Sequence, residues 1–131
     1  MLHSYGITEH VVGAPIRSSM DVAELPQGQS KRRLFMDQHA HESSGVIVIN
    51  RIKPHTDFHG LYESGLFKMC AIGLDKHAAA LEIHRFGVHG LKQIMPRAGE
   101  QIFGTGKILA GIAVVENAYG QPATIRALKA D

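Results

Sequence analysis

The sequence lacks tryptophan, holds a single cysteine and has an aromatic content of only 6%. Because Cys70 has no second cysteine to pair with, no disulfide can form within the chain, which favours a reducing, cytoplasmic location. No apolar run approaches the roughly 20 residues that a membrane helix needs. The amino terminus has no basic region followed by an apolar core, so a signal peptide is not expected either.

Neither positive nor negative charge predominates in the sequence. The chain has 14 Lys and Arg against 12 Asp and Glu, which gives a formal net charge of +2. This balance excludes a strongly basic nucleic-acid-binding protein and an acidic tail. The length of 131 residues and the apolar fraction of 44% suit one globular domain over residues 1–131. The one compositional excess is histidine, with nine residues.

Apolar runs predict the centre of the fold. Segment 45–50 is β-branched without polar alternation, which is typical of a strand covered on both faces in a parallel sheet. Segment 108–115 predicts a second buried strand and 123–128 a final one. Three segments between the first two strands are typical of helices: 61–74, 76–85 and 91–103. This order predicts an α/β class, with a small, partly parallel sheet flanked by helices.

Single residues predict where some helices begin and end. Asp37 predicts the N-cap of a short helix that runs through Glu42, and Asp75 predicts the N-cap of the helix over 76–85. Pro96 predicts a kink or a new helical start within 91–103.

A polar loop follows the first strand, over residues 51–60. Ligands usually bind at the carboxyl ends of strands in open α/β sheets. His55 and His59 are four residues apart with Asp57 between them, and imidazoles bind zinc or nickel while a carboxylate fixes their tautomer. The alternative is a polar loop that caps the next helix and bonds to backbone. Glu116 ends the second strand and is expected to face the same edge.

Lys68 and His84 form a second candidate pair. Lys68 lies in the apolar stretch 65–72, where a lysine either snorkels outward or is held in a low-polarity site that makes it a nucleophile or covalent tether. In one continuous helix His84 would lie about 24 Å away. A break at 73–75 would fold the second helix back and let both side chains approach one pocket. Otherwise His84 is a partly buried imidazole, and Cys70 is interpreted as a packing residue.

The sequence NRIKPHTDFHG at 50–60, continued by ESGLFKM at 63–69 and IGL at 72–74, resembles the nickel-dependent lactate racemase family. Further similarity lies in GITE at 6–9, GAPIRSSM at 13–20 and VVENAY at 114–119. The resemblance covers nearly the whole chain in the correct order. It matches the second half of the N-terminal catalytic domain of uncharacterised relatives.

That family uses a nickel-pincer nucleotide, a pyridinium ring with two thio-acid arms that clamp nickel. The resemblance implies that Lys68 tethers this cofactor through a thioamide and that His84 supplies a nickel ligand. It also implies that His55 is one of two acid/base histidines. Such a histidine takes the hydroxyl proton while hydride moves from the substrate carbon to the cofactor, and return of hydride to the other face inverts the centre.

The chain also departs from that family. The segment from His55 to Lys68 is longer, and the usual paired glycine before the lysine is replaced by SGLF at 64–67. Family members are much longer, and their nucleotide-phosphate motif, second acid/base histidine and substrate arginine have no counterpart here. The resemblance therefore implies a fragment or split form of a 2-hydroxy-acid racemase or epimerase that is not expected to act alone.

The alternative is a non-catalytic, histidine-rich metal-binding or interaction domain. On either interpretation, a partial domain exposes apolar surface where its missing neighbours would pack. We therefore expect a homo-oligomer or a complementing chain as partner, with a small 2-hydroxy acid as ligand if the site is active. Nucleic acid and membrane partners are not expected.

Overall fold

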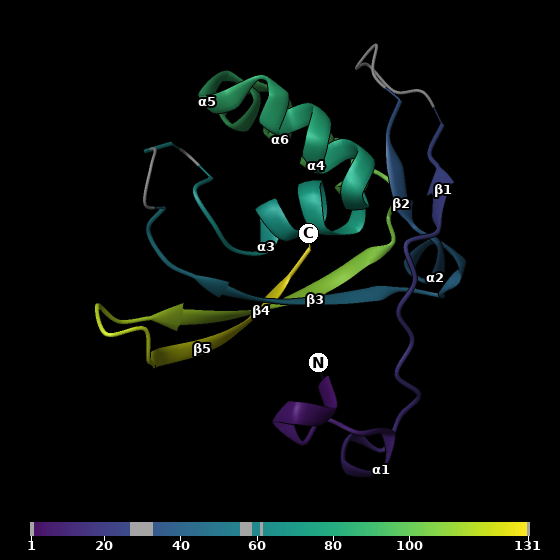
Figure 1. Ribbon diagram of the computed structural model, residues 1–131, viewed down its shortest axis with the longest axis vertical. Helices are drawn as coiled ribbons and strands as arrows, with labels where there is room; N and C mark the ends of the chain where they lie inside the picture. The colour runs from purple at the N-terminus through teal and green to yellow at the C-terminus, as the bar shows by residue number, and fades with distance from the viewer. Residues whose placement is uncertain (1, 27–32, 56–58, 61, 131) are drawn as a thin grey trace.

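A computed structural model of the chain describes residues 2–26, 33–55, 59–60 and 62–130. Its centre is a three-stranded sheet in the order β3-β4-β5, with helices packed on one face (Figure 1). The strands are β3 (Val46–Ile52), β4 (Ile108–Glu116) and β5 (Pro122–Lys129). β3 and β4 are parallel, whereas β4 and β5 are antiparallel. The predicted α/β class with a small, partly parallel sheet is confirmed.

A second sheet of two antiparallel strands stands beside the helices, formed by β1 (Val22–Glu24) and β2 (Phe35–Asp37). β2 leads directly into α2 (Gln38–Glu42). The Asp37 carboxylate accepts the backbone N–H of Ala40 at 2.8 Å, which confirms the predicted N-cap.

Residues 66–103 supply the helical layer. Its elements are α3 (Leu66–Lys68), the π-helical η2 (Met69–Leu74), α4 (Lys76–Arg85), α5 (Gly87–His89), the π-helical η3 (Gly90–Ile94) and α6 (Met95–Phe103). The predicted helix over 76–85 is confirmed. Pro96 lies in the first turn of α6, where its missing N–H costs no intrahelical bond.

The predicted helix over 61–74 begins only at Leu66, and residue 61 itself lies outside the described part of the chain. Among the described residues, no helix is long and apolar enough to cross a membrane.

The hydrophobic core lies between the helical layer and the covered face of the sheet. Its buried members are Leu25, Leu34, Met36, Val48, Cys70, Ala71, Ile83, Leu91, Met95, Ala98, Ile102 and Ile108. Leu66 of α3 packs closely against β4 at Gly111. A Cβ at this position would lie 2.5 Å from Cδ1 of Leu66. α3 therefore packs directly on the backbone of the central strand.

The prediction that β3 is covered on both faces is wrong. Val48 is buried beneath the helices, but Ile47 and Ile49 are 59% and 61% exposed on the opposite face. β3 is an edge strand, and the helices cover only one face of this sheet (Figure 1). An apolar run marks a face that can be buried, and it does not determine whether a second layer is present.

Asp75 occupies the predicted N-cap position of α4, but its side chain has another role. Asp75 makes no side-chain capping bond to α4, and its Oδ1 instead accepts the backbone N–H of Phe35 at 2.8 Å. The next residue, Lys76, has a positive φ of 57° and forms an ion pair with Asp37 at 2.7 Å. Contacts to β2 therefore fix the turn between η2 and α4.

The core placement predicts unequal effects of two leucine substitutions. Leu34→Ala should lower the free energy of unfolding by about 2–5 kcal/mol, because Leu34 is fully buried and its truncation leaves a cavity. The matched control Leu81→Ala, at an exposed position of α4, should change it by no more than about 0.5 kcal/mol. Urea unfolding followed by circular dichroism measures both. Equal losses would contradict this core.

Candidate functional site

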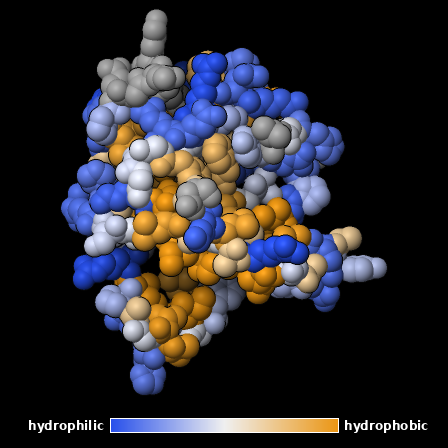
Figure 2. All heavy atoms as spheres, turned by 180° about the vertical axis from the view of Figure 1, so that it is seen from behind, coloured by the Kyte–Doolittle hydropathy of each residue, from blue (hydrophilic) through white to orange (hydrophobic). Residues whose placement is uncertain are grey.

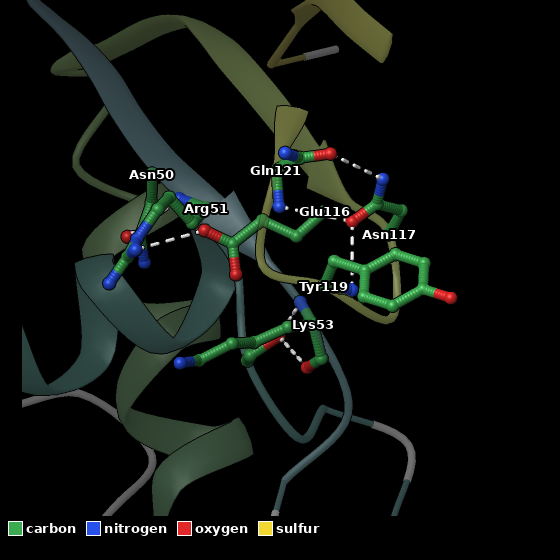
Figure 3. Close-up of polar contacts among 8 residues, drawn as sticks. Asn50, Arg51, Lys53, Glu116, Asn117, Tyr119 and Gln121 are labelled. Atoms are coloured by element: carbon green, nitrogen blue, oxygen red, sulfur yellow. Dashed lines mark hydrogen bonds and ion pairs between the residues drawn. The ribbon is translucent and has the colours of Figure 1, made fainter. Parts of the chain in front are cut away.

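The predicted ligand-binding edge lies where β3 and β4 end, and the loop after β3 is fastened there at both ends (Figure 3). The Asn50 side-chain amide donates to the carbonyl of Gly65 at 3.0 Å. The Ser64 hydroxyl accepts the backbone N–H of Lys53 at 2.9 Å and donates to the Lys53 carbonyl. These bonds close the loop and place α3 directly beside the end of β3.

The Glu63 carboxylate accepts hydrogen bonds from backbone groups of this loop. Its Oε2 accepts the backbone N–H of His55 at 3.0 Å, and its Oε1 accepts that of Gly60 at 3.1 Å. Nδ1 of His59 lies 3.2 Å from the same Oε1. The N–H groups of His55 and Gly60 together with His59 hold the pKa of the Glu63 carboxyl below its ordinary value. Glu63 therefore positions both histidines that the sequence singled out.

Asp57, predicted to lie between these histidines, falls outside the described residues. Glu63 is the carboxylate that organises this loop, although it was not among the predicted site residues. Its only local signal is the four-residue spacing from His59. The bond to the His55 backbone spans eight residues through a loop, which no periodicity reveals.

Lys68 ends α3 at the same edge. Its Nζ donates to the backbone carbonyl of Glu63 at 3.4 Å, and the side chain is half-buried. Burial lowers the pKa of the Lys68 ammonium, because desolvation disfavours the charged form. Glu63 thus contacts Lys68 through its carbonyl and His55 through its carboxylate. Partial burial favours the uncharged amine, and the nucleophilic or tethering role of Lys68 stays a prediction.

His84 lies in the last turn of α4, and the residue is exposed. α4 contacts η2, which directly precedes it in the chain, and η3. The predicted return of α4 beside the helix that carries Lys68 stays a prediction. A pocket of about 240 Å³ opens between the loop and the start of α6. It is lined by His59, Gly60, Tyr62, Leu91, Lys92, Gln93 and Pro96. A pocket shared by Lys68 and His84 stays a prediction.

A second cluster of polar side chains lies where β4 ends. Glu116 and Arg51 form an ion pair at 2.9 Å across the parallel strands, and only 5% of the Glu116 side chain is exposed (Figure 3). The Asn117 side-chain oxygen accepts the backbone N–H groups of Tyr119 and Gln121. Glu116 therefore joins the strand ends at this edge, and Asn117 builds the turn into β5.

Cys70 is fully buried in η2, two residues after Lys68. Burial raises the pKa of its thiol to about 11, so it is protonated at neutral pH. This supports its interpretation as a packing residue. Within the described part of the chain, no group of three or more His, Cys, Asp or Glu side chains is arranged to hold a metal ion.

The chain is thus a small α/β protein. Beyond the ends of its two parallel strands, Lys68 and His55 both form hydrogen bonds with Glu63. No family model, curated protein or solved structure matches the chain.

Glu63→Gln should loosen the loop, because the His55 and Gly60 N–H groups bind different carboxylate oxygens and glutamine replaces one of them with an NH₂ donor. Hydrogen exchange at neutral pH should show both amides exchanging faster than in the wild type, while Glu100→Gln on the exposed side of α6 leaves them unchanged. The folded-state pKa is lowered, so the stabilisation by Glu63 is present above the ordinary value of 4.5 and lost as pH falls through the folded-state pKa. Unchanged exchange in Glu63→Gln would refute this anchoring.

The buried thiol gives a separate prediction. Cys70 should resist a disulfide reagent such as dithionitrobenzoate at neutral pH in the folded protein, and react completely once urea unfolds the chain. The absorbance of the released thiolate measures both rates. Rapid reaction under native conditions would show that η2 opens or that Cys70 is exposed.

Proposed function

We propose that this chain forms part of the active site of a 2-hydroxy-acid racemase or epimerase that uses a tethered nickel-pincer nucleotide. The single observation that carries the proposal is the position of Lys68. Its half-buried amine, with a lowered pKa, lies at the edge of the parallel strands and contacts the same Glu63 that binds the His55 backbone. The sequence resemblance assigns the tether and the acid/base group to this same lysine and this same histidine.

The residues fit such a cofactor. A thioamide tether needs an amine that is unprotonated part of the time, and burial provides this at Lys68. Nickel that is already held by carbon and sulfur needs few protein ligands, so a single imidazole such as His84 is sufficient. His84 is exposed on α4 and therefore accessible to a ligand. A cluster of three protein ligands is not required.

In this proposal Lys68, His84 and His55 have different roles in the reaction. When bound, the cofactor supplies the acceptor for the substrate hydride. Lys68 would hold the cofactor through a covalent tether, and His84 would provide one nitrogen ligand to the nickel. His55 takes the proton from the substrate hydroxyl and returns it, while Glu63 restrains the His55 backbone so that the imidazole is positioned before the substrate binds. The substrate class is a small 2-hydroxy acid.

A second candidate function is an interaction domain without catalysis. The uncovered apolar face of the sheet favours it, since large exposed patches mark surfaces that bind another chain. Under either function we propose a homo-oligomer or a complementing chain as partner. Nickel or zinc uptake with no covalent adduct on Lys68 would favour the other non-catalytic alternative, a histidine-rich metal-binding domain.

The tether is tested by co-expression with enzymes that build the cofactor, followed by intact mass and peptide mapping. A nucleotide-sized adduct should be found on Lys68, and Lys68→Arg should lose it because a guanidinium is a poor nucleophile. Lys53→Arg is the matched control at the same edge and should keep the adduct. His84→Ala should keep the adduct and lose nickel. No adduct on the wild type would refute the tether.

The reactivity of Lys68 can be measured without any cofactor. Because burial lowers its pKa, competitive acylation with a small anhydride should label Lys68 at lower pH than N-acetyl-lysine amide in the same tube. Peptide mass spectrometry across the pH range from 7 to about 11 gives both midpoints. A Lys68 midpoint at or above that of the model amide would contradict a desolvated amine.

A further inference from the structure

The open face of the three-stranded sheet has apolar side chains on all three strands, between the charged residues Arg51 on β3 and Lys129 on β5. The strand register places Ile49 beside Ile112 and Val114 beside Ile125, with Ile47 in the same row as Ile49. Ile47, Ile49 and Ile125 are each about three-fifths exposed. In the view from behind, Figure 2 shows hydrophobic residues gathered across the middle and the lower part of the molecule. Such a surface is costly to leave in water.

A second apolar surface lies on the amino-terminal arm, which we define as residues 2–13. The arm contains the short helices η1 (Leu2–Tyr5) and α1 (Glu9–Val12), and neither contributes a buried residue. Tyr5 and Val11 are 75% and 70% exposed. Three further arm residues are exposed large hydrophobics: Leu2, Ile7 and Val12. The arm stands apart from the sheet, on the side away from the helices (Figure 1).

We propose that two copies of this chain exchange arms, so that the arm of each copy covers the open sheet face of the other. The contact is reciprocal, as two-fold symmetry requires, and it covers both apolar surfaces at once. It does not depend on the chemistry of Lys68 or on the function proposed above.

The areas involved match a stable dimer. Side chains with these exposed fractions carry on the order of 300 Å² of apolar surface on the face and about 500 Å² on the arm. Because a contact covers about as much surface on each side, the smaller face limits each contact to about 600 Å², and two symmetric contacts would bury roughly 1,200 Å², the lower end of the size typical of specific protein complexes. One such contact alone would be too small for a lasting association.

Local contacts fix the geometry of the arm and of the segment that follows it. The Ile16 backbone N–H donates to Glu9 Oε1 at 2.8 Å, which ties α1 to the segment that follows it. Gly13 ends α1 in the left-handed conformation, and Pro15 restricts the next step of the chain. These contacts fix the shape of the arm itself, and the sheet face stays exposed. A second copy offers an arm and a sheet face together, so it is the occupant that can cover both surfaces.

Light scattering after size exclusion should show a dimer for the wild type at micromolar concentration. Val11→Asp places a charge on the arm and should raise the dimer dissociation constant by at least about tenfold. Val88→Asp is the matched control, since Val88 is an exposed valine on α5 outside both surfaces. It should leave the dimer unchanged. A wild type that is monomeric throughout, or a dimer that survives Val11→Asp, would overturn the proposal.

Cysteine crosslinking identifies the exchange directly and does not rely on a disruptive variant. Val11→Cys and isotope-labelled Ile49→Cys are mixed and oxidised gently, while the buried Cys70 stays unreactive. A disulfide joining one labelled and one unlabelled chain is the expected product. The double variant Val11→Cys with Ile49→Cys tests whether the arm instead packs on the sheet of its own chain. A disulfide formed only within one chain would show that packing and would overturn the exchange.

Discussion

Parallel pairing of β3 with β4 determines where everything else in this molecule lies. A parallel partner requires the chain to travel from the end of one strand back to the beginning of the other. Residues 53–107 make that return, and they contain the whole helical layer together with the polar loop. The pairing therefore places the helices on one face and brings the ends of both strands to one edge, where the candidate site forms.

At this edge, acidic side chains hold the chain in position. Glu63 accepts two backbone N–H groups of its own loop, and Glu116 forms an ion pair with Arg51 on the neighbouring strand. His55 and Lys68 are both positioned through Glu63. Rigid support of this kind is what a site for covalent or proton-transfer chemistry needs, because small displacements of a reacting group cost much of its rate.

The one-sided covering of the sheet has the opposite consequence on the other face. Three strands and one helical layer bury Val48 and leave Ile47 and Ile49 in water. The arm, fastened by the Glu9 bond to Ile16, exposes a comparable apolar surface. The polar edge and the uncovered apolar face thus both arise from the same arrangement of three strands and one helical layer.

The sequence by itself determined the local structure. The apolar run over 45–50 predicted β3, the helix-favouring stretch over 76–85 predicted α4, and Asp37 and Pro96 marked helix starts. These signals act between residues at most a few positions apart. Tertiary structure alone decided that only one face of the sheet is covered, that Asp75 binds the Phe35 backbone, and that Glu63 organises the loop. Those outcomes depend on partners far apart along the chain or within an irregular loop, which periodicity and capping rules do not encode.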